Sequence, residues 1–133
     1  MGKYVFPAVF TAEESGMYAV NFPDLESCYT SGENLADAMK MAGDVLALTL
    51  YEYEKQKKPV PQPSDVHSIP VEGNEFVNYV FSDTLYYQKK FNRKSVKKTL
   101  SIPEWLNDMA IAQNINFSQT LQEAIENKLG IPV

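Results

Sequence analysis

The chain has 133 residues, of which 44% are hydrophobic and 22% charged, an ordinary composition for one globular domain or two small ones. No apolar run reaches the roughly 18 residues that a membrane helix needs, and no basic-then-apolar leader opens the chain. Cys28 is the only cysteine and His67 the only histidine, which excludes an internal disulfide framework and a metal site built on several of these residues. We therefore expect a protein of the reducing cytoplasm, without a membrane segment, metal or cofactor.

The net charge of −5 is unevenly distributed along the chain. Residues 1–92 contain 7 Lys and Arg against 13 Asp and Glu, whereas residues 93–133 contain 5 against 4. Four basic residues also precede the first acid of the second segment: Arg93, Lys94, Lys97 and Lys98. This pattern predicts an acidic body that repels nucleic acid and a basic stretch that can meet phosphates. A solvated charge run at a domain junction is the alternative interpretation.

The first part of the chain has the period-two alternation of β-strands. Residues 3–10 and 17–22 alternate between faces, which predicts a hairpin closed by the turn at residues 12–16. Pro7 lacks the N–H group that a ladder needs, so we expect the first strand to lie at a sheet edge or to be bulged there. A short third strand is expected at residues 28–30.

A long amphipathic helix is predicted next, from an N-cap at Asn34 to about residue 56. Asp37 lies three residues after the cap, near the positive end of the helix dipole. The apolar residues recur at spacings of three and four, which gives one stripe that packs on a sheet. The members of this stripe are Leu35, Ala38, Met39, Ala42, Leu46 and Leu50.

The proline-rich segment 59–65 is expected to be an extended connection, and residues 75–82 have the aromatic and β-branched composition of a strand. The first 82 residues thus read β-β-β-α-β, an α+β layer with one main helix on a small sheet. Residues 83–94 are compatible with a short helix or with a linker. We place the first domain at residues 1–92 and the second at residues 93–133.

The second domain begins with an alternating segment, Val96–Ile102, in which Lys97, Thr99 and Ser101 share one face. Val96, Leu100 and Ile102 share the other face, where Lys98 is the one misfit. Pro103 suits the start of a helix that carries Trp105, Leu106, Met109 and Ala110. Asn116 or Ser118 caps a second helix, which Gly130 and then Pro132 end.

One strand and two short helices do not close a core alone. Pairing with the same strand of a second chain would form a two-stranded antiparallel ribbon, with Lys97, Thr99 and Ser101 displayed twice on its outer face. Such a ribbon fits the major groove of B-DNA. The N–H groups at the start of the second helix, near Asn116 and Ser118, suit a DNA phosphate. The alternative for the Lys-Thr-Ser triplet is a simple exposed strand face.

This segment resembles the ribbon-helix-helix DNA-binding proteins. The likeness lies in the strand VKKTLSIP, the helix begun by Pro103 and Glu104, and the turn and second helix in NFSQTLQEAI. The resemblance implies an obligate dimer with residues 97, 99 and 101 in the groove and a phosphate at the start of the second helix. The triplet here is Lys, Thr and Ser rather than richer in Arg or Gln, which leaves the preferred base sequence open.

The first part resembles the HicB antitoxins, and with the second part the likeness covers nearly the whole chain. It is carried by FPAVF, a Glu-Glu-Ser-Gly turn, YAVNFPDLESCYTSGENLADAM and PVPQPS. Many relatives have Pro-Gly where this chain has Glu26-Ser27, which alters a turn. The resemblance implies a truncated RNase H-like first domain, neutralisation of HicA, a small basic mRNA-cleaving toxin, and repression of the protein's own operon.

The acidic first domain would attract such a basic partner. Our hypothesis for the toxin-contacting surface is the turn formed by Phe22, Pro23, Asp24 and Leu25. Operator DNA is the other expected partner. We expect a homodimer through the second domain, and a tetramer if the first domains pair as well.

Two other functions are compatible with the sequence. An orphan transcriptional regulator would have the same DNA-binding end but no toxin partner. A metal-dependent nuclease would need clustered carboxylates, for which Asp24, Glu52 and Asp83 lie at suitable element ends. Because 17 acids make such a triplet easy to pick by chance, we expect a protein that is not an enzyme and has no catalytic residue.

Overall fold

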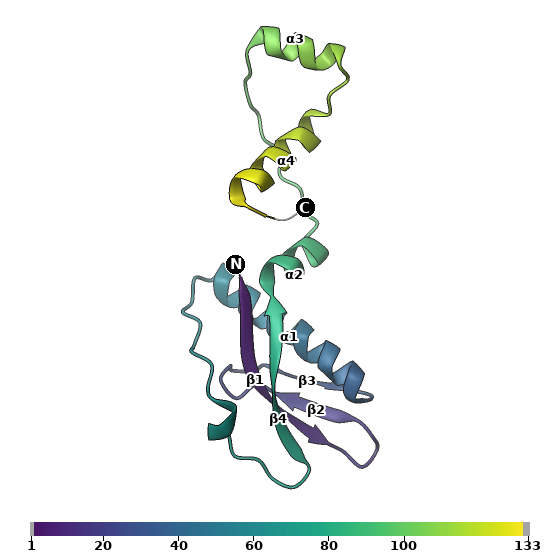
Figure 1. Ribbon diagram of the computed structural model, residues 1–133, viewed down its shortest axis with the longest axis vertical. Coiled ribbons are helices and arrows are strands. Elements are labelled where there is room, and N and C mark those ends of the chain that lie inside the picture. The colour runs from purple at the N-terminus through teal and green to yellow at the C-terminus, as the bar shows by residue number, and fades with distance from the viewer. Residues whose placement is uncertain (1, 132–133) are drawn as a thin grey trace. The chain divides into compact units, whose positions relative to one another are not determined.

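The computed structural model describes residues 2–131 and divides the chain into two compact units, Met1–Lys94 and Ser95–Val133 (Figure 1). The sequence placed this boundary at residue 92. The first unit contains β1 (Lys3–Ala12), β2 (Tyr18–Asn21), β3 (Tyr29–Gly32), α1 (Leu35–Lys55), the short 3-10 helix η1 (Val66–Ser68), β4 (Glu75–Asp83) and α2 (Thr84–Phe91). The second unit contains α3 (Glu104–Ala112) and α4 (Phe117–Leu129). No helix in the described part of the chain has the length and apolarity to cross a membrane.

The first unit is an α+β layer, as predicted. Its sheet has the order β3-β2-β1-β4, with every neighbouring pair antiparallel, and α1 lies across one face (Figure 1). Alternate side chains of β1 point toward α1, and four members of the predicted apolar stripe, Ala38, Ala42, Leu46 and Leu50, meet them in one core. The other two predicted members, Leu35 and Met39, are exposed. The core contains Phe6, Ala8, Phe10, Val20, Phe22, Leu25, Cys28, Ala38, Ala42, Leu46, Leu50 and Val80.

The predicted start and end of α1 are confirmed. The Asn34 side chain accepts a hydrogen bond of 2.9 Å from the Asp37 amide, and the Asp37 carboxylate accepts one of 2.9 Å from the Glu33 amide. These reciprocal bonds satisfy amides that a helix start otherwise leaves unpaired. The helix ends at Lys55, and Lys57 follows in the left-handed region with φ of 56°. The ambiguous stretch after β4 contains a helix, α2, which Asp83 caps by accepting from the Leu85 and Tyr86 amides.

The expected edge position of β1 is wrong, because β1 lies between β2 and β4. β4 pairs with β1 along Lys3 to Thr11, and Pro7 lies opposite Tyr79. On the other side, the pairing with β2 begins only at Val9. Pro7 therefore lies where the central strand has one ladder partner, which is how the sheet tolerates a residue without an N–H group.

Gly32, at the end of β3, is required by the close approach of α1. A Cβ atom at this position would lie 2.3 Å from the Ala38 nitrogen, and that nitrogen belongs to backbone that cannot swing away. Glycine therefore lets the last strand residue contact the first turns of the helix directly.

The second unit has almost no core of its own. Asn114, with φ of 55°, separates α3 from α4. The Asn116 side chain caps α4 by accepting a hydrogen bond from the Gln119 amide at 3.0 Å. Gly130 ends α4 in the left-handed region with φ of 70°. Pro132 lies outside the described residues. The strand expected at Val96–Ile102 is not formed within one chain, because no strand pairs with it among residues 2–131. In the described part of this unit, Ala110 is the one buried residue.

A hydrogen-bond network joins the two ends of the first unit. The Tyr4 hydroxyl donates to Glu54 Oε2 at 2.7 Å, and the Thr84 hydroxyl donates to the same oxygen at 3.2 Å. The Gly2 amide donates to Thr84 Oγ1 at 2.8 Å, while the Thr84 amide donates to the Gly2 carbonyl at 3.0 Å. The start of β1, the end of α1 and the start of α2 are thereby held together.

We expect Tyr4→Phe to lower the free energy of unfolding by about 1–2 kcal/mol at pH 8, because it removes a hydrogen bond to a charged carboxylate. The bond to Glu54, followed by burial and the charge of Glu54, raises the pKa of Tyr4 from 10.0 to about 12. The contribution of this hydrogen bond to the free energy of unfolding is therefore complete below pH 10, and it is lost as the pH rises toward 12. Urea unfolding of both proteins at pH 8 and pH 11.5 measures it.

Tyr29→Phe is the matched control, since Tyr29 is 67% exposed on β3. This variant should follow wild type at both pH values. A difference between wild type and Tyr4→Phe that stays constant from pH 8 to pH 11.5 would contradict the assignment.

Candidate functional site

The five predicted DNA-contacting residues are all exposed in the second unit. Lys97, Thr99 and Ser101 lie in the segment before α3, which has no helix or strand (Figure 1). Ser118 lies in the first turn of α4, and the oxygen of Asn116 caps that turn. A helix start carries partial positive charge and amides without an intrahelical acceptor, so this end of α4 can receive an anion.

The second unit also has a largely apolar groove of about 610 Å³ between residues 98–102, α3 and α4, and Ser118 is one of its polar lining residues. Leu100 is 63% exposed and Trp105 is 64% exposed, although side chains of this kind are normally buried. Lys98, the misfit of the alternating pattern, also lines the groove. The apolar lining consists of Leu100, Ile102, Leu106, Ala110, Ile115, Phe117, Leu121 and Ala124.

Two of the four residues in the predicted toxin-contacting turn, Phe22 and Leu25, are buried, and the structure contradicts the prediction for these two. Phe22 is 1% exposed and Leu25 is 4% exposed, because both side chains belong to the core beneath α1. Asp24 accepts hydrogen bonds from the Ser64 amide at 2.8 Å and the Ser64 hydroxyl at 2.5 Å. Pro23 is the one exposed member of the four. The turn therefore anchors the extended proline-rich segment to the sheet, and Phe22 and Leu25 do not present a surface.

The acids considered for a nuclease have separate structural tasks. Asp24 holds Ser64, Asp83 caps α2, and Glu52 lies half-buried on α1. Within residues 2–131, no three His, Cys, Asp or Glu side chains gather in a way that could hold a metal ion. Burial raises the pKa of the Cys28 thiol, against a hydrogen bond from Thr49 that lowers it, so this cysteine lies in the core as a thiol.

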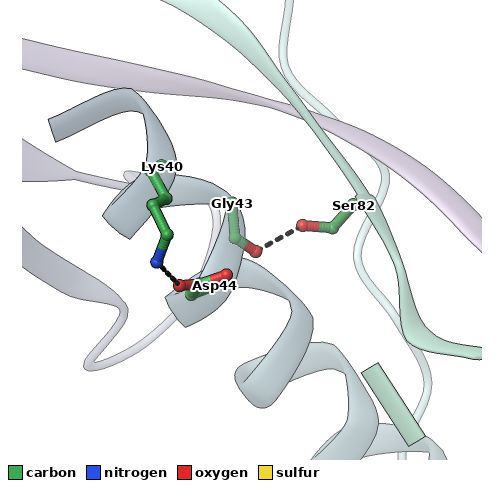
Figure 2. Close-up of polar contacts among 4 residues, drawn as sticks. All are labelled: Lys40, Gly43, Asp44 and Ser82. Atoms are coloured by element: carbon green, nitrogen blue, oxygen red, sulfur yellow. Dashed lines mark hydrogen bonds and ion pairs between the residues drawn. The ribbon is translucent and has the colours of Figure 1, made fainter. Parts of the chain in front are cut away.

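A feature that the sequence did not predict is a hollow of about 360 Å³ in the first unit, at the outer edge of β4. One wall is α1 and the other is α2. Figure 2 shows how α1 is fastened to β4 beside it, where the Ser82 hydroxyl donates to the Gly43 carbonyl at 2.6 Å. The lining residues are Gly43, Asp44, Ala47, Phe81, Ser82, Asp83, Tyr86, Tyr87, Lys90 and Phe91. A glycine inside a predicted helix and the closely spaced aromatics at 86, 87 and 91 were the available signals.

These features define a small α+β binding protein: one unit has its own core, and the other exposes an apolar groove and a basic, polar face. The family model described as "HicB_like antitoxin of bacterial toxin-antitoxin system" matches residues 5–72, which is just over half of the chain. The chain belongs to this HicB-like antitoxin family.

Relatives and solved structures agree with this family. "Antitoxin HicB" of Escherichia coli (strain K12) is 33% identical over 63 residues, covering 47% of this chain and 46% of that protein. The match thus spans about half the length of the curated relative. A structure described as "Toxin-Antitoxin complex from Streptococcus pneumoniae" is 29% identical with a TM-score of 0.62, covering 95% of this chain and 99% of that one.

A second solved structure, "HicA3 and HicB3 toxin-antitoxin complex", has a TM-score of 0.50. It covers 60% of this chain and 99% of that one. At 22% sequence identity, it shows similarity of fold.

Proposed function

We propose that this antitoxin neutralises a HicA-type mRNA-cleaving toxin through its first unit, and represses its own operon through its second unit as a ribbon-helix-helix dimer. The observation that carries the proposal is the exposure of the apolar side chains of the second unit around the groove between residues 98–102, α3 and α4. In this proposal the protein acts in the cytoplasm and carries out no catalysis.

A second copy of the chain is the occupant that fits this groove. Residues 96–102 have no strand partner in the described chain, and their alternation gives one apolar and one polar face. Antiparallel pairing with the same segment of another copy would satisfy both backbones and bring Val96, Leu100 and Ile102 onto one shared core. A two-fold interface of this kind is self-complementary, so one patch is enough.

The same pairing would place the DNA-contacting groups on the opposite face. Lys97, Thr99 and Ser101 would each appear twice on a ribbon narrow enough for the major groove. Lys97 would neutralise phosphates, and the hydroxyls would reach base edges or phosphate oxygens. The amides at the start of α4, beside Ser118, would receive a backbone phosphate.

The charge of the first unit supports a basic partner. Residues 1–92 contain 13 acids against 7 bases, and such a surplus steers oppositely charged proteins toward the surface. We also propose that this unit is a truncated RNase H-like domain. The antiparallel β1-β2-β3 meander followed by α1 across the sheet supports this, and the separate tasks of Asp24 and Asp83 fit a domain used for binding.

Leu100→Glu is expected to break the dimer contact, because it would place a carboxylate in an apolar interface. Desolvating that charge costs several kcal/mol, so the dissociation constant of this contact should rise at least about 100-fold. Sedimentation velocity at micromolar concentration should give Leu100→Glu half the mass of wild type. Ser101→Glu, one residue away on the polar face, should keep the wild-type mass. A Leu100→Glu protein of wild-type mass would move the contact to the first unit.

Lys97→Ala should weaken binding to the protein's own promoter DNA and flatten its salt dependence. A dimer has two Lys97 side chains, and each phosphate contact contributes about 0.9 to the slope of log K against log salt, so the slope should fall by roughly 2. Fluorescence anisotropy across a salt series measures this, with scrambled DNA for comparison. Lys55→Ala, exposed at the end of α1, is the control. Equal slopes for wild type and Lys97→Ala would remove Lys97 from the DNA surface.

Co-expression with a HicA-type toxin should restore the growth that the toxin inhibits, and should yield a complex on purification. The triple variant Lys97→Ala, Thr99→Ala and Ser101→Ala should neutralise the toxin as well as wild type, because it leaves the first unit unchanged. If wild type neither rescues growth nor binds that protein, the toxin-neutralising half of the proposal fails and an orphan regulator takes its place.

A further inference from the structure

The hollow at the outer edge of β4 is a feature of the first unit that the fold itself does not explain. Its floor is the end of β4 around Phe81, its first wall is α1 at Gly43 and Asp44, and its second wall is α2. β4 is an edge strand, so a partner can approach this side of the sheet. The volume of about 360 Å³ is large enough for a long side chain.

Gly43 is an unexpected residue in the middle of a 21-residue helix. Glycine is among the poorest helix formers, and alanine is the best. Unlike Gly32, Gly43 is not required by the packing of this chain: a Cβ atom there would lie 3.7 Å from the Phe81 carbonyl oxygen, an ordinary contact. The missing side chain instead widens the hollow beside α1, as expected where another molecule approaches the helix closely.

On α2, the second wall, the ammonium group of Lys90 already lies close to two aromatic rings. Lys90 Nζ lies 5.4 Å from the centroid of the Phe91 ring and 5.9 Å from that of the Tyr86 ring. The Tyr87 and Phe91 rings are themselves in contact, with centroids 4.8 Å apart. Tyr86 is 63% exposed and Phe91 is 57% exposed. These rings therefore offer an open aromatic surface of the kind that attracts positively charged groups.

Carboxylates surround the same hollow. Asp44 lines it from α1, where its Oδ2 pairs with Lys40 at 3.1 Å on an exposed turn of the helix (Figure 2). Asp83 lines it from the end of β4. The pKa of the Tyr87 hydroxyl is raised, first by burial and then by the charge of Glu52, the Tyr51 hydroxyl and the charge of Asp44. The hollow therefore combines apolar walls with two carboxylates, Asp44 and Asp83, beside the ammonium group of Lys90.

We propose that this hollow receives an arginine side chain of the basic toxin, which stacks on Tyr86 and Phe91 in place of Lys90 and meets the carboxylates of Asp44 and Asp83. This inference rests on the proposed function and locates the contact within it. Arginine fits better than lysine, because its planar guanidinium stacks on rings and bonds carboxylates at the same time. On binding, the Lys90 side chain would move aside into solvent.

The test is a set of dissociation constants for a purified HicA-type toxin, measured by titration calorimetry with the full-length antitoxin. Gly43→Leu fills the hollow with a good helix former, and Tyr86→Ala removes a ring; each should weaken binding at least about 10-fold. Lys90→Ala removes the competing cation and should tighten binding about 3-fold or more. Weaker binding by Tyr86→Ala together with tighter binding by Lys90→Ala would indicate a cation-binding site. General damage to the fold would instead weaken binding in both variants.

Tyr29→Ala is the matched control, an exposed tyrosine at the opposite edge of the sheet, and it should bind like wild type. Thermal unfolding followed by circular dichroism confirms that each variant is folded. If both Gly43→Leu and Tyr86→Ala bind with wild-type affinity, the proposed arginine site in the hollow is wrong, while the proposed function stands. Weaker binding by Lys90→Ala would have the same meaning. If the wild-type protein does not bind the toxin, both the proposed neutralisation and the proposed arginine site are wrong.

Discussion

The exposed apolar surface of the second unit is the constraint on which the proposed assembly depends. Within the part of this unit that the structure describes, up to residue 131, eleven large apolar side chains are exposed: Val96, Leu100, Ile102, Trp105, Leu106, Met109, Ile111, Ile115, Phe117, Ile125 and Leu129. Leaving this much apolar surface in water is unfavourable, at about 25 cal/mol for each Å² that a partner would otherwise cover. A second copy that supplies both the missing strand and the missing half of a core removes the cost in a single step.

The first unit, in contrast, buries large apolar side chains in a core within one chain. Its helix α1 is long enough to cover the sheet, and Phe6, Phe10, Leu46 and Leu50 fill the space between them. Because this unit has its core within one chain, its acidic and aromatic side chains remain on the surface. The proposed function assigns toxin binding to this acidic unit and DNA binding to the second unit, which has the basic stretch.

The sequence predicted local elements well and long-range arrangement less well. Periodicity and capping residues predicted the four strands of the first unit and the limits of α1 from Asn34 onward, because these depend on neighbours in the chain. The position of β1 was wrong, because it depends on β4, some seventy residues later. Phe22 and Leu25 were misassigned for a similar reason: a turn that is exposed in isolation is covered once α1 lies over it.

The candidate sites show the same division. The assignment of Lys97, Thr99 and Ser101 to one face rests on their spacing in a single segment and stays a prediction, because this segment forms no strand in the described chain. The hydrogen bonds between Asp24 and Ser64 could not be predicted, because the two residues lie forty positions apart. The hollow was missed because α1, β4 and α2 each contribute only part of it, and none of those parts has a motif of its own.

The pairing of the first long strand with the last one also sets the order of events during synthesis. β1 contacts β4 from Lys3 opposite Asp83 to Thr11 opposite Glu75, so the strand at the centre of the sheet keeps an open side until residue 83 has left the ribosome. Contacts this distant in sequence slow folding, and they leave an apolar strand exposed in the growing chain. The sheet of the first unit therefore becomes complete only after residue 83 has emerged, and a nascent chain that is shorter lacks the full pairing of its central strand.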